Sequence, residues 1–135
     1  MWYDPVFKVT TIYGEEVWRR RHYKVRRGNS PGQFFFSVLD NGVTSNEFWR
    51  IVDCDDNMSW AVFYYSGCAA AAGTAYSGSL LVTKDGQWPV SSESTLTRIY
   101  KAFDKFEILP WELFEVNNND CDANCKAGPP PIGYK

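Results

Sequence analysis

The chain has few of the residue types that build metal centres and none of the long apolar runs that cross membranes. Among its 135 residues there are one histidine, His22, and four cysteines. Cys121 and Cys125 are one helical turn apart, but neither a second pair nor a nearby histidine completes a zinc site. No apolar run reaches about 18 residues, and no signal or transit peptide is recognisable. We therefore expect neither a metal site nor a membrane-spanning helix.

The sequence also lacks an excess of charge of one sign. Its 14 Lys and Arg residues against 16 Asp and Glu residues give a net charge of −2, which argues against a nucleic-acid-binding chain. Hydrophobic residues make up 44% of the chain and aromatic residues 17%, and this composition excludes intrinsic disorder. Because aromatic side chains favour strands, the composition predicts one packed domain rich in β-structure.

The cysteines leave the redox state open. Cys54, Cys68, Cys121 and Cys125 allow three disulfide pairings, and their spacing does not select one of them. Disulfide bonds would indicate an oxidising compartment, and inert thiols are the alternative.

Six segments have the alternating aromatic and β-branched residues of strands, with turn residues between them. They are residues 7–13, 17–25, 33–39, 47–52, 59–65 and 76–83. Short strands at close intervals predict an antiparallel meander, and hence a sandwich or an up-and-down barrel. The small residues of 67–75 predict a compact loop or hairpin connection, or else a place where something large, such as a flat, long ligand at a barrel rim, approaches the backbone closely.

The periodicity changes after residue 90. Apolar residues at the spacing of an amphipathic helix within 91–106 are Leu96, Ile99, Tyr100 and Phe103. We expect this helix to lie across the outside of the sheet with all four side chains buried. Residues 108–116 contain Pro110 and predict a short extended segment packed back by Trp111 and Phe114. The chain thus divides into a β-domain, 1–116, and a polar, proline-containing tail, 117–135.

Alternation on neighbouring strands brings an acid and aromatic residues together. Glu47 and Trp49 share one face of their strand, and Phe63 and Tyr65 share one face of the next. If both faces point inward, a carboxyl group and a phenol meet in an aromatic cavity. Apolar surroundings disfavour the charged form of a carboxyl group, which suits a general acid in mildly acidic conditions. The alternative is a glutamate at the cavity mouth and a core tyrosine whose hydroxyl is hydrogen-bonded.

A basic run lies within residues 19–27. Its arginines are Arg19, Arg20, Arg21, Arg26 and Arg27. On an edge strand such charges block unwanted strand pairing. They also suit an anionic partner, either an acidic protein surface or the lipid headgroups of a membrane. Nucleic acid is the least favoured partner, because the domain as a whole is acidic.

Three motifs, in this order and spacing, resemble the lipocalin-like domain of the violaxanthin de-epoxidase family. They are Asn46–Ile51, with its acid two residues before Trp49, then Ala61–Gly67, with its Tyr-Tyr pair, and Ala75–Gly78. The turn at Pro31-Gly32, the apolar face of the expected helix and a cysteine shortly before prolines fit the same pattern. The resemblance covers roughly residues 31–131.

The resemblance implies a lipocalin-like antiparallel up-and-down barrel with one C-terminal amphipathic helix. It also implies a plastid protein of the thylakoid lumen or the thylakoid surface. Enzymes of the family remove epoxide oxygens from carotenoids, with ascorbate as the reductant, when the lumen acidifies. The family's acid roles fall on Glu47 and Tyr65. The residues expected to line the pigment site are Phe36, Trp49, Phe63, Tyr65 and Tyr76.

The chain departs from the family pattern in several places. It has no Gly-x-Trp opening strand, and the stretch linked to pH sensing is Ser37-Val38-Leu39-Asp40, without a histidine. About two opening strands of an eight-stranded barrel are missing. Either more strands exist than the pattern indicates, or the natural chain is longer, or a neighbouring chain covers the open edge.

We therefore expect a domain that binds carotenoid or chlorophyll, or docks as an accessory subunit on a photosynthetic membrane complex, and is not fully catalytic. No covalently bound cofactor is expected. The alternatives are an active xanthophyll de-epoxidase that uses ascorbate and a lipocalin that carries another apolar ligand.

Overall fold

The computed structural model of the chain describes residues 1–40, 42–69, 73–88 and 92–118. Its elements in chain order are β1 (Trp2–Tyr3), β2 (Val6–Thr10), β3 (Glu16–Arg20), β4 (Tyr23–Arg27), β5 (Gln33–Asp40), β6 (Val43–Cys54), β7 (Trp60–Ala69), β8 (Thr74–Thr83), α1 (Glu93–Asp104) and the 3₁₀ helix η1 (Pro110–Glu112). The expectation of a mainly β, antiparallel protein with one α-helix is confirmed.

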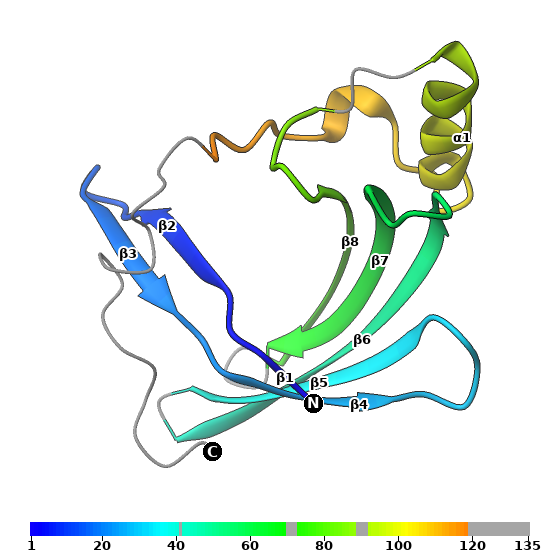
Figure 1. The fold of residues 1–135 in the computed structure, drawn as a ribbon. Helices are drawn as coiled ribbons and strands as arrows, with labels where there is room; N and C mark the ends of the chain where they lie inside the picture. Colours follow the sequence, from blue (N-terminus) through cyan, green and yellow to red (C-terminus); the bar gives the residue numbers. More distant parts are fainter. Residues whose placement is uncertain (41, 70–72, 89–91, 119–135) are drawn as a thin grey trace.

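The strands form a curved, open sheet. Six strands pair in the order β1-β4-β5-β6-β7-β8, and β2 and β3 form a separate two-stranded sheet. Figure 1 shows β4 to β8 bending around a concave side, with the β2–β3 hairpin rising on the opposite flank. Within the described residues no strand pairs with the outer edge of β8, so the sheet does not close into a barrel.

The first two predicted strands form one bent hairpin. The same register runs through β1–β4 and β2–β3, from Trp2 opposite Lys24 to Thr10 opposite Glu16. The ladder breaks at Pro5, which has no N–H to donate, although its carbonyl still accepts from the Arg21 amide at 3.1 Å. The predicted single strand 17–25 is therefore wrong: the bend divides it into β3 and β4.

A buried histidine lies at this bend. The His22 ring is 9% exposed, stacks on Trp2 at 4.4 Å between centroids, and hydrogen-bonds through Nδ1 to the Asp4 carboxylate. These contacts come from both strands of the hairpin, so they fix its bend.

The later strands are longer than the sequence pattern predicts. β6 begins at Val43 rather than 47, and β7 and β8 extend into the small-residue stretch as far as Ala69 and from Thr74. The ladder continues through these small residues, with Gly67 opposite Tyr76 and Ala69 opposite Thr74, because backbone groups alone make its hydrogen bonds. The connection between β7 and β8 is correspondingly short.

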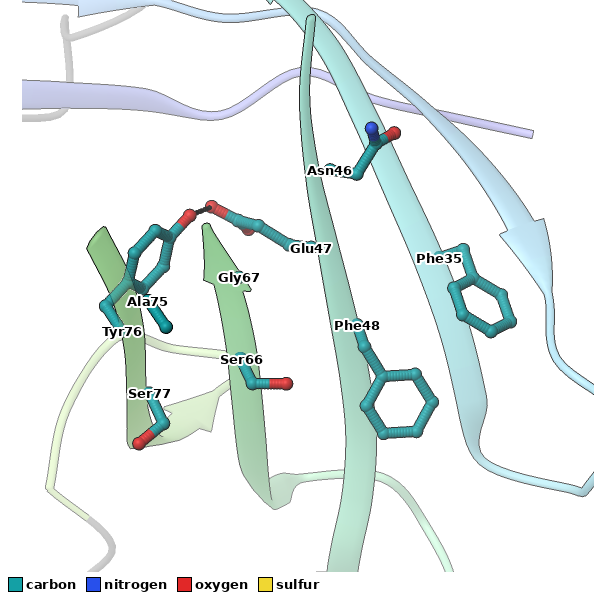
Figure 2. Close-up of a pocket in the computed structure, with 9 residues that line it drawn as sticks. All are labelled: Phe35, Asn46, Glu47, Phe48, Ser66, Gly67, Ala75, Tyr76 and Ser77. Carbon is teal, nitrogen blue, oxygen red and sulfur yellow. Dashed lines mark hydrogen bonds between the residues drawn. The ribbon is translucent and has the colours of Figure 1, made fainter. Parts of the chain in front are cut away.

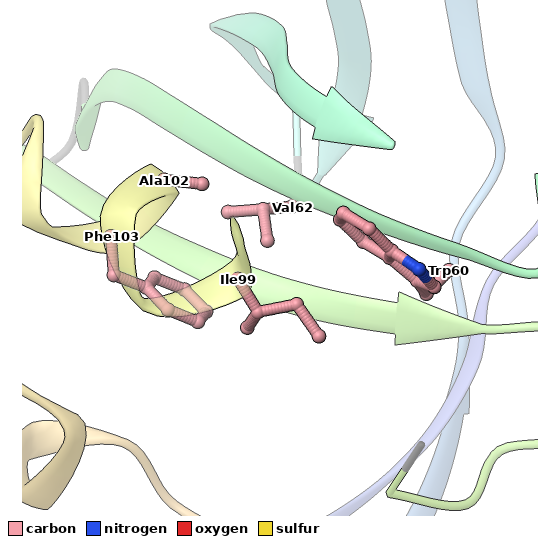
Figure 3. Close-up of a cluster of buried hydrophobic side chains, with 5 residues drawn as sticks. All are labelled: Trp60, Val62, Ile99, Ala102 and Phe103. Atoms are coloured by element: carbon pink, nitrogen blue, oxygen red, sulfur yellow. The ribbon is translucent and has the colours of Figure 1, made fainter. Parts of the chain in front are cut away.

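The helix packs on the outer side of the sheet. Ile99, Ala102 and Phe103 are buried against Trp60 and Val62 of β7, and Figure 3 shows these five side chains gathered in one cluster. Val62 alternates with Phe63, which faces the concave side, so α1 covers the opposite face. The expected position across the outside of the sheet is confirmed.

The expected burial of the four helix residues holds only in part. Ile99 and Phe103 are fully buried and Leu96 is half-buried, but Tyr100 is 41% exposed. The outer face curves away from the helix, so only a narrow stripe is covered. Ala102, which the pattern missed, lies in that stripe.

A salt bridge holds the helix to a β-bulge. The register shifts between Ile51 and Asp53, which aims Asp53 at α1. Arg98 Nη2 donates to Asp53 Oδ1 at 2.7 Å, and its guanidinium lies 5.2 Å from the Trp60 ring centroid. The hydrogen bond from Arg98 is the main reason that the pKa of Asp53 lies below its usual value.

The segment after the helix differs from the prediction. Its centre is the 3₁₀ turn η1 rather than an extended strand, because Pro110 at the first position favours a helical start. Trp111 is 78% and Phe114 92% exposed, and it is Ile108 and Leu113 that pack on the core. Of the predicted tail, residues 119–135 lie outside the described part of the chain.

Candidate functional site

Two cross-strand rows build the concave face of the sheet. The first row places Phe36, Glu47, Gly67 and Tyr76 opposite one another on β5 to β8. The second places Phe34, Trp49, Tyr65 and Gly78 opposite one another. Because directly opposite residues share a face, the sheet brings the predicted site residues together on its concave side.

The aromatic rings of these rows contact one another continuously. Trp49 is central: its ring lies 4.9 Å from Phe36, 5.1 Å from Tyr65 in a stacked arrangement, and 5.8 Å from Phe63. Tyr76 continues the series beyond Tyr65 at 6.4 Å. Such ring pairs add specific contact energy to simple burial, so the rings form a fixed platform.

The bent hairpin extends this platform at its other end. Tyr3 of β1 lies 5.7 Å from the Phe36 ring, and Tyr23 of β4 lies 5.9 Å from it. Sequence reasoning missed both tyrosines. Tyr23 could have been found by alternation from Val25, but Tyr3 belongs to a two-residue strand that no periodic pattern reveals.

The platform lines an open hollow of about 430 Å³. Its lining residues are Tyr3, Pro5, Phe7, Tyr23, Phe36, Glu47, Trp49, Tyr65, Tyr76 and Leu80. Four of the five predicted ligand-lining residues are among them. The fifth, Phe63, contacts the Trp49 ring edge-on and does not line the hollow.

Glu47 is the one acidic side chain in this lining, and both its oxygens accept hydrogen bonds. The Trp49 indole Nε1 donates to Oε2 at 2.7 Å, and the Tyr76 hydroxyl donates to Oε1 at 2.6 Å. Figure 2 shows Tyr76 and Glu47 pointing toward each other across Gly67. The phenol that meets the carboxylate is therefore Tyr76, whereas Tyr65, the predicted partner, stacks on Trp49.

The hydroxyl of Tyr76 is held in its neutral form. Burial raises its pKa above the usual range, and the hydrogen bond to Glu47 raises it further. A neutral phenol can donate to the carboxylate, and an ionised one would repel it. The pair therefore acts as a fixed donor and acceptor.

Two glycines make room for the two phenols. A Cβ at Gly67 would lie 2.7 Å from the Tyr76 hydroxyl, and a Cβ at Gly78 would lie 2.5 Å from that of Tyr65. The arrangement is reciprocal, since each tyrosine of β7 and β8 leans over the glycine of the other strand. Close approach to the backbone is one predicted alternative for the small-residue stretch that begins at Gly67, whereas no sequence pattern indicates it for Gly78.

Neither a metal centre nor a disulfide forms in the part of the chain that the structure describes. Its His, Cys, Asp and Glu residues make no group that could hold a metal ion. Cys54 and Cys68 are free cysteines, and Cys121 and Cys125 lie outside the described residues. The chemistry that the concave face offers is aromatic contact and one hydrogen-bonding carboxylate.

The predicted basic surface is divided by the bend in the hairpin. Arg19 is exposed on β3, and Arg20 and Arg21 are half-buried at the break. Arg26 and Arg27 are exposed on β4, in the other sheet, and Arg21 lies over the Phe7 ring at 5.8 Å. The five arginines therefore do not form one continuous face.

Comparisons with family models, with curated proteins and with solved structures found no match for this chain. In the described residues no helix is both long and apolar enough to cross a membrane.

Proposed function

We propose that this chain binds an elongated, largely apolar and conjugated ligand on the concave face of its sheet. The observation that carries the proposal is the continuous aromatic platform from Tyr3 to Tyr76, centred on Trp49, beside a single carboxylate. Flat polyene and macrocyclic ligands gain most from contact with such rings. Carotenoid and chlorophyll are the ligands of this kind that the family resemblance favours.

The size and openness of the hollow support a long ligand. Its volume of about 430 Å³ lies within the range of about 300–1,000 Å³ usual for small-molecule sites. The hollow is open along the sheet, so a rod-shaped molecule can extend beyond it. Glu47 offers one fixed acceptor, which suits a ligand hydroxyl or another single polar group.

Catalytic de-epoxidation with ascorbate is the second candidate, and Glu47 is the residue that favours it. Both Glu47 oxygens already accept hydrogen bonds from Trp49 and Tyr76. These two hydrogen bonds fix the carboxylate as an acceptor that orients a ligand, so binding without turnover is the better supported function. A transporter of another apolar ligand would use the same platform.

The family resemblance extends the proposal to location and architecture. A lipocalin-type barrel, open on one side between β8 and the β2–β3 hairpin, is the proposed architecture. The proposed location is the plastid, in the thylakoid lumen or on the thylakoid, in association with a photosynthetic membrane complex. A neighbouring chain at the edge of β8 would then complete the enclosure.

Ligand binding can be tested with variants of two adjacent residues on opposite faces. Phe36 lies in the platform and Phe35 on the outer face. Phe36→Leu should weaken binding of a xanthophyll, followed by quenching of tryptophan fluorescence, by about 2–10-fold, the worth of one aromatic pair. Phe35→Leu should leave the affinity unchanged. Equal effects of the two variants, or the absence of any saturable binding, would overturn the proposal.

Turnover is measured in the same preparation. Incubation with violaxanthin, ascorbate and galactolipid at acid pH should leave the pigment unchanged if the domain only binds. If the pigment is converted, Glu47→Gln should lower the rate by about 10²–10⁴-fold, the usual contribution of a general acid.

A further inference from the structure

The outer face of the six-stranded sheet carries a row of basic and aromatic side chains. Arg26 of β4 lies opposite Phe35 of β5, which lies opposite Phe48 of β6. Opposite residues of an antiparallel pair share a face, and alternation adds Lys24 and Arg50 to the same side. All three basic residues are exposed.

This face is positively charged although the chain as a whole is acidic. Outside the area covered by α1, no acidic side chain lies among the described outward-facing residues of β4 to β8. Lys24, Arg26 and Arg50 make no ion pair within the described part of the chain. Their charges are therefore available to an external anion.

An aromatic pair lies between these charges. The Phe35 and Phe48 rings are 5.4 Å apart, and Phe35 is 43% exposed. Beside them is an open hollow of about 630 Å³, which Phe35, Phe48, Ser66 and Ser77 line together with Glu47 and Tyr76 of the concave-face site. Figure 2 shows Phe35 and Phe48 on neighbouring strands, with Ser66 and Ser77 on the next two strands of the sheet. The surface thus combines an apolar centre, polar hydroxyls and a basic margin.

We propose that this outer face docks on an anionic lipid bilayer, with Phe35 and Phe48 at the headgroup–acyl boundary and Lys24, Arg26 and Arg50 on lipid phosphates. The five residues of this docking face are not part of the aromatic platform on the concave face. This face differs from the predicted basic surface, since Arg26 is the one member of the five predicted arginines that belongs to it.

Curvature favours a bilayer over an acidic protein as the occupant. A stable protein interface buries about 800 Å² on each partner, and a convex face offers a rigid partner little area to contact. A fluid bilayer deforms around a convex patch, accepts aromatic side chains at its interface and supplies many phosphates at once.

The test is co-sedimentation of the full chain with vesicles. Phosphatidylcholine vesicles containing phosphatidylglycerol should bind the protein, pure phosphatidylcholine vesicles should not, and added salt should weaken binding. Replacement of Lys24, Arg26 and Arg50 by Gln should lower partitioning by about 100-fold, at about fivefold for each charge near the surface. Phe35→Ser should lower partitioning without changing its salt dependence.

A matched triple variant controls for net charge. Arg19, Lys101 and Lys84 are exposed or partly exposed basic residues outside this face, and their replacement by Gln should retain most of the binding. Circular dichroism of every variant confirms that it folds. Equal loss in both triple variants, or no binding to the anionic vesicles, would overturn the proposal. Binding to an acidic protein without binding to vesicles would also overturn it, in favour of a protein partner.

Discussion

At the scale of single residues, two glycines shape the site because they have no side chain. Gly67 and Gly78 leave space into which Tyr76 and Tyr65 lean from the neighbouring strand. Tyr76 can therefore reach Glu47 across one strand, at 2.6 Å. A polar contact between β6 and β8 would otherwise be blocked by the side chain that stands between them on β7.

Alanine at Gly67 should separate this pair. Its Cβ would approach the Tyr76 hydroxyl and ring to 2.7 and 2.8 Å, so Tyr76 must move away from Glu47. We expect Gly67→Ala to lower the free energy of unfolding by about 1 kcal/mol, typical of one lost hydrogen bond. Urea denaturation measures the change. Ser77→Ala, next to Tyr76 on the outer face, is the control and should change stability by less than about 0.5 kcal/mol.

Tyr76 should also make the protein sensitive to alkaline pH. Its pKa in the folded chain is raised, first by burial and then by Glu47, above the ordinary value of 10.0. The stabilisation it contributes is therefore complete below pH 10.0 and is lost as the pH rises toward the folded pKa. Tyr76→Phe should reduce this alkaline loss of stability, measured by urea denaturation across pH. An unchanged profile would contradict the assignment.

At the scale of elements, the helix contributes through one narrow stripe. Phe103 and Ile99 face the sheet and are fully buried, whereas Tyr100, the residue after Ile99, is 41% exposed. The apolar pattern predicted the helix and its side of the sheet correctly. It could not predict how much of the stripe is covered, because the curvature of β6 and β7 decides that.

Two alanine variants measure the width of the stripe. Phe103→Ala should lower the free energy of unfolding by about 3–5 kcal/mol, the usual cost of emptying a packed phenylalanine site. Tyr100→Ala should cost much less, because its ring is largely solvated. Chemical denaturation checks both values. A cost below about 1 kcal/mol for Phe103→Ala would mean that α1 does not pack as described.

At the scale of the whole molecule, the buried core is divided. One cluster lies under α1 around Phe103, and the other lies between β4 and β5 around Val25 and Val38. The aromatic platform between them is only half-buried, and Tyr76 is 36% exposed. A bound ligand would cover this apolar surface and join the two clusters.

A ligand of the proposed kind should therefore stabilise the fold. At a free concentration about 100 times its dissociation constant it should add about 2.7 kcal/mol. Thermal unfolding with and without xanthophyll measures the shift. Phe36→Leu should reduce the shift at fixed concentration and Phe35→Leu should not. The same shift in unfolding temperature in the unaltered protein and in both variants would indicate nonspecific association.

The sequence by itself determined the local features of this protein. Alternation placed Glu47 and Trp49 on one face of their strand and Phe63 and Tyr65 on one face of the next, and helical spacing placed Ile99 and Phe103 on one face of the helix. These periods depend only on the local backbone conformation. Composition likewise determined a packed β-domain.

Tertiary structure decided which of these faces meet and what lies between them. The partner of Glu47 is Tyr76 rather than Tyr65, because register sets opposite pairs and Gly67 leaves the gap between them. The division of the strand at Arg21-His22 follows from Pro5, which lies between β1 and β2 on the other side of the hairpin, and the openness of the sheet follows from strand pairing. Such relations join residues distant in the chain, and no local pattern contains them.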